Sequence, residues 1–168
     1  MRNLLIAIIF QIGWFACVFG GANTVELPIA LAVAVTLLAC NLWLKRQELA
    51  QEIRLVLSVT LIGFCIETIN LATGVFTLTH PGSYPWLCPA WFLLLWALFA
   101  TLLRGPFNWL AGRYWLSALL GAIFAAPNYF AGARLGAVTF NANLVFSFAL
   151  LAIVWALAMP LMIWLARK

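Results

Sequence analysis

The sequence predicts an all-α membrane protein, a bundle of six transmembrane helices that forms a single domain over residues 1–168. Composition and hydrophobic pattern carry this prediction. Hydrophobic residues make up 67% of the chain and charged residues only 8%, whereas a soluble domain is about 25% charged. Six apolar runs follow one another along the chain, and each is close to the roughly 20 residues that cross a bilayer.

Short polar or turn-forming segments separate the six predicted helices. Pro28 lies in the first turn of the second run, where its missing N–H costs little. The most charged segment, residues 45–54, precedes the third run and is predicted to be mostly loop. The predicted spans are residues 4–21, 27–44, 55–76, 86–103, 114–135 and 143–166.

The distribution of lysine and arginine predicts the orientation, because cytoplasmic loops are enriched in both residues. With six crossings, eight of the nine lysines and arginines fall on one side, and only Arg134 falls on the other. Both termini are therefore expected in the cytoplasm of a bacterial inner membrane (N-in/C-in). A cleaved signal peptide is the alternative for the first run, but Gln11 and Trp14 interrupt its apolar core.

Several function classes find little support in the sequence. The net charge is +5, but the cations lie singly or in pairs at the ends of runs, so no nucleic-acid partner is expected. Cys17, Cys40, Cys65 and Cys88 are scattered and are expected to be small buried hydrophobic residues. No spacing typical of metal ligands and no cofactor or nucleophile motif is present. We therefore predict no metal and no cofactor, and an enzymatic activity is not favoured.

Glu67 is the most informative polar residue, because it lies inside the third apolar run. An ionisable group in the membrane is costly and is a functional candidate by default. Its functional interpretation is a proton-titrating or cation-contacting group in a cavity. The structural alternative is a polar bond to Gln11, Asn70, Asn128 or Arg134. At helical spacing Glu67 shares one face with small and polar residues, namely Thr60, Gly63, Asn70 and Gly74.

The fifth run carries a similar stripe of small and polar residues. Small residues let helix backbones approach closely, so we expect the third and fifth helices to pack tightly against each other. Asn128 is then expected at the depth of Glu67, with Arg134 nearer the outer surface. Pro127 is expected to kink the fifth helix. The residues of this stripe are Ser117, Gly121, Ala125, Asn128 and Gly132.

Several stretches of the chain resemble one family of small bacterial inner-membrane proteins, DUF2878, a domain of unknown function. They are Gln11–Cys17, the carboxylate at Glu67, and parts of the segment from Leu98 to Ala137. The resemblance covers nearly the whole chain and implies a multi-span membrane protein without assigning a reaction. Gly105-Pro106 stands where the family pattern has a polar pair resembling His-Ser, so no histidine role is carried over. The matching single positions are Gln11, Trp14, Glu67, Tyr129 and Arg134.

Three functional hypotheses follow. The first is that the protein binds or transports a lipid or another amphipathic molecule, with Arg134 facing an anionic head group. The second is a non-catalytic accessory subunit, which has a protein partner or a second copy of the chain. The third, a membrane-embedded lipid-modifying enzyme, is the weakest, because no acid–base set is visible. The candidate ligand-binding residues are Gln11, Trp14, Glu67, Asn70, Asn128, Tyr129 and Arg134.

Overall fold

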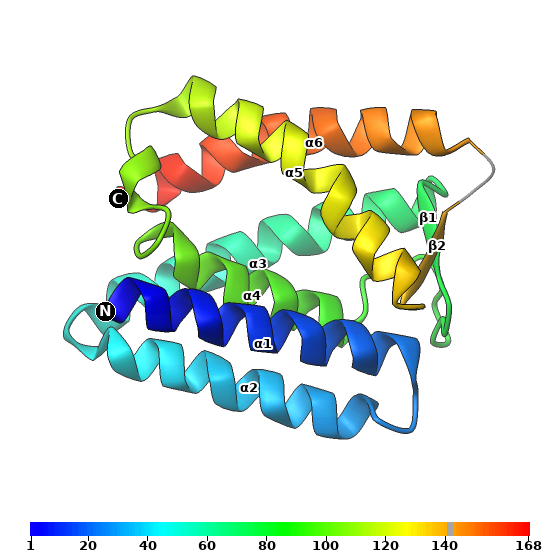
Figure 1. Cartoon of the computed structure of the whole chain (residues 1–168), viewed down its shortest axis with the longest axis horizontal. Coiled ribbons are helices and arrows are strands. Elements are labelled where there is room, and N and C mark those ends of the chain that lie inside the picture. Colours follow the sequence, from blue (N-terminus) through cyan, green and yellow to red (C-terminus); the bar gives the residue numbers. More distant parts are fainter. Residues whose placement is uncertain (141–142) are drawn as a thin grey trace.

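The computed structural model describes residues 1–140 and 143–168 and is largely α-helical (Figure 1). The helices are α1 (Arg2–Ala22), α2 (Leu27–Leu44), α3 (Leu49–Ala72), α4 (Ala90–Leu103), α5 (Tyr114–Arg134) and α6 (Leu144–Leu165). Two 3-10 turns, η1 (Arg46–Glu48) and η2 (Asn108–Leu110), and two strands, β1 (Phe76–Leu78) and β2 (Val138–Phe140), complete the described part. Five helices, α1, α2, α3, α5 and α6, are long and apolar enough to cross a membrane. The all-α prediction is confirmed, and these helices indicate a multi-pass membrane protein.

Helix α4 is shorter than a membrane span and lies inside the bundle. Its 14 residues extend about 21 Å, less than the hydrocarbon core of about 30 Å. It begins at Ala90 rather than at residue 86, because Pro89 occupies its N-cap in an extended conformation. Ten of its residues are buried, between the α1–α2 pair and helices α3 and α6 (Figure 1). A helix that protein surrounds does not need to match the bilayer thickness.

The pairing of the helices differs from the prediction. The closest neighbours are α5 with α6, α1 with α2, and α3 with α4, so the predicted tight packing of the third helix on the fifth is wrong. Both small-residue stripes are contact surfaces, but the stripe on α3 packs against α4 and the stripe on α5 packs against α6. A Cβ on Gly63 would lie 2.2 Å from the ring of Trp96 in α4, and one on Gly121 would lie 2.5 Å from the carbonyl oxygen of Trp155 in α6.

The charged segment predicted to be loop folds as η1 and the start of α3. Glu52 is only 1% exposed there, and it accepts a hydrogen bond from Lys45 Nζ at 2.9 Å. Lys45 also donates to the carbonyl oxygen of Thr101 at 2.9 Å. Arg104, at the end of α4, forms an ion pair with Glu48 at 2.8 Å. The helix tolerates these charges because they pair with one another, which the sequence pattern does not show.

Helices α3 and α5 end in the same way, and each leads into a short strand. Gly74 and Gly136 have φ values of 71° and 88°, the left-handed conformation that commonly ends a helix. Gly74 therefore ends the third helix before Phe76, where the prediction had placed its last residue. The two strands then pair antiparallel, with Phe76 opposite Phe140. This pairing joins the ends of α3 and α5 at the side of the bundle opposite the two termini (Figure 1).

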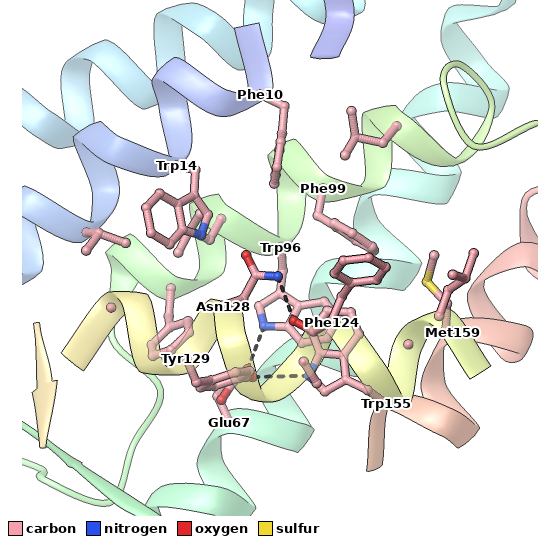
Figure 2. Close-up of a pocket in the computed structure, with 18 of the residues that line it drawn as sticks. Phe10, Trp14, Glu67, Trp96, Phe99, Phe124, Asn128, Tyr129, Trp155 and Met159 are labelled. Carbon is pink, nitrogen blue, oxygen red and sulfur yellow. Dashed lines mark hydrogen bonds between the residues drawn. The ribbon is translucent and has the colours of Figure 1, made fainter. Parts of the chain in front are cut away.

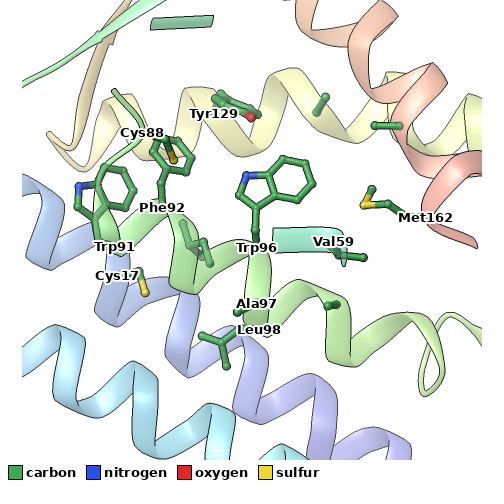
Figure 3. Close-up of a cluster of buried hydrophobic side chains, with 14 of the residues drawn as sticks. Cys17, Val59, Cys88, Trp91, Phe92, Trp96, Ala97, Leu98, Tyr129 and Met162 are labelled. Atoms are coloured by element: carbon green, nitrogen blue, oxygen red, sulfur yellow. The ribbon is translucent and has the colours of Figure 1, made fainter. Parts of the chain in front are cut away.

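The core is rich in aromatic residues and centres on α4 (Figure 3). Trp91 and Phe92 stack with ring centroids 4.3 Å apart, and Trp96 follows one turn later. Cys17 and Cys88 are buried, as expected, but Cys40 and Cys65 are exposed on the outside of the bundle. The prediction was wrong for these two, because an apolar run in a membrane protein contains outward-facing positions as well as buried ones.

Candidate functional site

Glu67 is fully buried and accepts hydrogen bonds from three side chains, of which Figure 2 shows Trp96 and Tyr129. Trp96 Nε1 donates to its Oε1 at 3.0 Å, the Tyr129 hydroxyl donates to the same oxygen, and Asn70 Nδ2 donates to Oε2 at 3.4 Å. Trp155 Nε1 donates in turn to the Tyr129 hydroxyl oxygen at 3.4 Å. We call these five residues the Glu67 network. It connects α3, α4, α5 and α6 through side chains alone.

Two close helix approaches position the indoles of the network. Gly63 precedes Glu67 by one turn, and its missing side chain leaves the space that the Trp96 ring occupies. Gly121 allows the backbone of α6 to approach α5 at Trp155. The two indoles then stack, with ring centroids 4.9 Å apart and planes inclined by 17°. The small residues next to the polar ones therefore make room for aromatic side chains from neighbouring helices.

A cavity of about 560 Å³ lies beside the Glu67 network. Side chains from α1, α4, α5 and α6 line it, together with Glu67 from α3, and eleven of its 24 lining residues are aromatic. Among these lining residues, Glu67 is the only Asp, Glu, Lys, Arg or His. Small-molecule sites commonly have volumes of roughly 300–1,000 Å³, mostly apolar walls and a few polar groups. The cavity has the size and the chemistry of such a site.

The cavity reaches the protein surface between α1 and α5. Phe10 and Trp14 of α1 lie across it from Phe124 and Asn128 of α5 (Figure 2). Phe124 and Trp109, which also line it, are 58% and 51% exposed. Because α1 and α5 are apolar helices long enough to cross a membrane, an opening between them would face the bilayer rather than the aqueous phase.

The structure brings together some of the residues that the sequence singled out. Glu67, Asn70 and Tyr129 belong to the Glu67 network, and Trp14 and Asn128 line the cavity. Gln11 and Arg134 are exposed and do not line it. Of the seven candidate residues, five therefore lie at this site.

Asn128, which the sequence placed at the depth of Glu67 as one of its possible partners, forms no hydrogen bond with Glu67 in the described structure. The Asn128 carboxamide instead donates from Nδ2 to the carbonyl oxygen of Phe124 at 2.7 Å. Tyr129, its neighbour in the chain, reaches Glu67. The buried face of α5 continues from Ala125 to Tyr129 at a spacing of four residues, whereas the predicted stripe took a spacing of three at this point. One position along a helix rotates a side chain by about 100°.

Trp96 and Trp155 are the site residues that the sequence reasoning missed. Neither of them was assigned a role from the sequence. Both lie near the middle of an apolar run, far from either predicted interface. A buried indole N–H usually finds a hydrogen-bond acceptor, and Glu67 was the strongest acceptor predicted at that depth. This combination is a signal that could have identified them.

The described part of the chain contains no group of three His, Cys, Asp or Glu side chains that could hold a metal ion. What the cavity offers is apolar and aromatic surface with the Glu67 network at one wall, an arrangement suited to holding an amphipathic molecule.

The comparisons with known proteins give a family and no closer relative. No curated protein and no solved structure matches the chain. The model of a family described as protein of unknown function (DUF2878) matches residues 3–161. This range includes every residue of the Glu67 network and every residue that lines the cavity. The chain belongs to the DUF2878 family.

Proposed function

We propose that this protein binds an amphipathic molecule, such as a lipid, in the cavity beside the Glu67 network. The observation that carries the proposal is an aromatic cavity that opens between two apolar helices. A ligand would enter it sideways from the bilayer, and its hydrocarbon part would lie against the aromatic wall. Close packing of the hydrocarbon part against the aromatic side chains would then contribute to binding.

The polar groups of the cavity favour an uncharged head group over an anionic one. Arg134, which the sequence had suggested as an anion contact, lies outside the cavity. No lysine, arginine or histidine is among the described lining residues, so a phosphate would have no counter-charge. Asn128 offers its carboxamide oxygen and Tyr129 its hydroxyl group, and both suit a hydroxyl or an amide of the ligand.

Filling the cavity from Gly132 is expected to abolish binding without unfolding the protein. Gly132 lines the cavity, and a Cβ added there would meet only Val138 Cγ2, at 4.0 Å. A leucine at this position would therefore extend into open space. Native mass spectrometry of the purified protein, alone and after incubation with hexadecanol as an uncharged single-chain probe, measures the bound molecule. Gly132→Leu is expected to lower occupancy at least tenfold.

Gly132→Ala is the matched control. It adds one methyl group, leaves most of the cavity free and removes a helical glycine, so we expect unchanged binding and up to about 1 kcal/mol of added stability. Equal occupancy in the wild type and in the leucine variant would contradict the proposal. A wild type that carries no molecule and does not bind the probe would favour an accessory role, and a stoichiometric partner should then appear in a mild-detergent pull-down.

We infer further that the chain crosses a bacterial inner membrane six times, with both termini in the cytoplasm. Both termini lie at the same end of the bundle (Figure 1). The sequence places eight of the nine lysines and arginines at the ends of helices on that side, as cytoplasmic segments require. Helix α4 provides the fourth crossing inside the bundle, and the turns and irregular residues 79–89 connect it to β1.

Cysteine labelling in intact cells tests this topology. In a background with the four native cysteines changed to alanine, Ser83→Cys lies in the exposed segment before α4, and Gln47→Cys lies in η1. We expect a membrane-impermeant maleimide to modify the cysteine at position 83 in intact cells. The cysteine at position 47 should react only after the membrane is permeabilised. The reverse pattern would invert the topology, and labelling of both positions in intact cells would exclude an odd number of crossings between the two, and with it the single crossing by α3.

A further inference from the structure

We propose a second binding site, which holds the phosphate group of an anionic phospholipid at the end of the bundle where α4 and α6 end. The site is a pocket of about 70 Å³. Gln51, Arg54 and Ser58 of α3, Arg104 at the end of α4 and Lys168 provide its polar walls. None of these residues lines the cavity beside the Glu67 network, so the site is independent of the function proposed above.

The ion pairs around this pocket leave two cations without an acidic partner. Lys45 and Arg104 pair with Glu52 and Glu48, at 2.9 and 2.8 Å, and these four side-chain charges cancel. Arg104 also approaches Glu52 through Nε, at 3.7 Å, so its guanidinium group is held in place. Arg54 and Lys168 form no ion pair within the described residues.

The pocket therefore combines one oriented guanidinium group with two cationic side chains that form no ion pair within the described residues. Ser58 and Gln51 add uncharged hydrogen-bond donors on the same helix, α3. Basic pockets between helices at the cytoplasmic side of a membrane are typical binding sites for lipid head groups. The volume of the pocket suits a phosphate-sized group and leaves the rest of a lipid outside.

The surroundings of the pocket favour a lipid over a soluble phosphate compound. Trp164 is exposed at the end of α6, and the Lys168 ammonium lies over its ring, 5.0 Å from the centroid. An exposed tryptophan at the end of an apolar helix is typical of the membrane interface, where lipid phosphates lie. Leu57 and Leu61 continue along α3 as exposed apolar surface. An acyl chain could lie against them while the phosphate occupies the pocket.

Lipid retention measured by native mass spectrometry tests the site. The purified protein is titrated with phosphatidylglycerol and, separately, with phosphatidylcholine. The test variant is Arg54→Gln/Lys168→Gln, and the matched control is Arg113→Gln/Arg134→Gln, which loses the same charge at exposed positions outside the pocket. Since each basic residue near an anionic lipid surface is worth roughly a factor of five in affinity, we expect the test variant to bind phosphatidylglycerol about 30-fold more weakly. The control variant should match the wild type.

Three results would overturn the proposal. Equal losses in the test and control variants would show that only the overall charge matters. Equal affinity of the wild type for the two lipids would show that the phosphatidylglycerol head group is not recognised. Competition by glycerol 3-phosphate at concentrations similar to those of the lipid would assign the pocket to a soluble compound. Circular dichroism of both variants, with helix content equal to that of the wild type, establishes that the comparison is made between folded proteins.

Discussion

Replacing Glu67 by leucine is expected to lower the free energy of unfolding by about 3–5 kcal/mol. The carboxylate accepts hydrogen bonds from Trp96, Tyr129 and Asn70 inside the bundle. Leucine removes the acceptor and leaves these donors buried. Each unsatisfied buried donor costs roughly 1–3 kcal/mol, and local rearrangement recovers part of that sum. Unfolding in mixed micelles of detergent and dodecyl sulfate, followed by circular dichroism, measures the change.

Glu67→Gln removes the negative charge of the side chain but keeps an oxygen that accepts hydrogen bonds. Its amide oxygen can still accept from Trp96 and Tyr129, and Asn70 can turn its carboxamide to pair with the new amide group. We therefore expect a loss below about 1.5 kcal/mol. Leu61→Ala, at a position that is 64% exposed on the same helix, controls for a general effect of altering α3 and should change stability by less than about 0.5 kcal/mol. A leucine variant as stable as the wild type would show that the network does not stabilise the bundle.

The same pair of variants shows how Glu67 acts in binding. Its side chain is fully buried, and its hydrogen-bond partners Trp96 and Tyr129 line the cavity. We therefore assign it a positioning role, in which it fixes the aromatic wall. Glu67→Gln should retain the bound amphiphile, whereas Glu67→Leu should lose it even under conditions in which the protein stays folded. Loss in the glutamine variant, with stability intact, would instead indicate that the carboxylate charge or its proton takes part in binding.

The sequence was sufficient to predict the helical class and most helix positions, because membrane spans are set by the length and apolar character of each run. It also identified Glu67 and the small residues around it as a contact face. It could not predict which helix would pack there. Gly63 permits close approach by any helix, and the structure places the Trp96 ring of α4 against it. Helical periodicity gives the direction of a face and contains no information about its partner.

The remaining errors have separate physical causes. Asn128 was placed on the facing stripe and Tyr129 was named only through the family resemblance, yet the tyrosine donates its hydroxyl proton to Glu67. Helix α3 extends into the charged segment because Lys45 and Glu52 neutralise each other there. Lys45 and Glu52 are only seven residues apart, but the other partners of this segment, the Thr101 carbonyl oxygen and Arg104, come from α4. Local rules cannot supply contacts between residues so far apart in the sequence.

The second large effect is expected at this buried ion pair, where Lys45→Met should destabilise the protein by about 3–5 kcal/mol. Both side chains are nearly inaccessible, at 6% for Lys45 and 1% for Glu52. Burial lowers the pKa of the Lys45 ammonium, and the Glu52 carboxylate opposes that change. The charge on Lys45 therefore depends on its partner. Without the Lys45 ammonium, Glu52 keeps only the longer approach of Arg104 Nε among the described residues, and the Thr101 carbonyl oxygen loses a hydrogen-bond donor.

The double variant Lys45→Met/Glu52→Leu distinguishes the value of the pair from the cost of breaking it. Two buried charges pay a large desolvation penalty that their attraction only partly offsets, so an apolar replacement of both is often neutral. We expect the double variant to recover most of the stability that Lys45→Met loses in the same micelle titration, and Arg46→Ala, an exposed neighbour, to have little effect. Recovery would mean that the pair is tolerated rather than required for stability. A double variant no more stable than Lys45→Met would contradict this and assign the loss to the Thr101 contact.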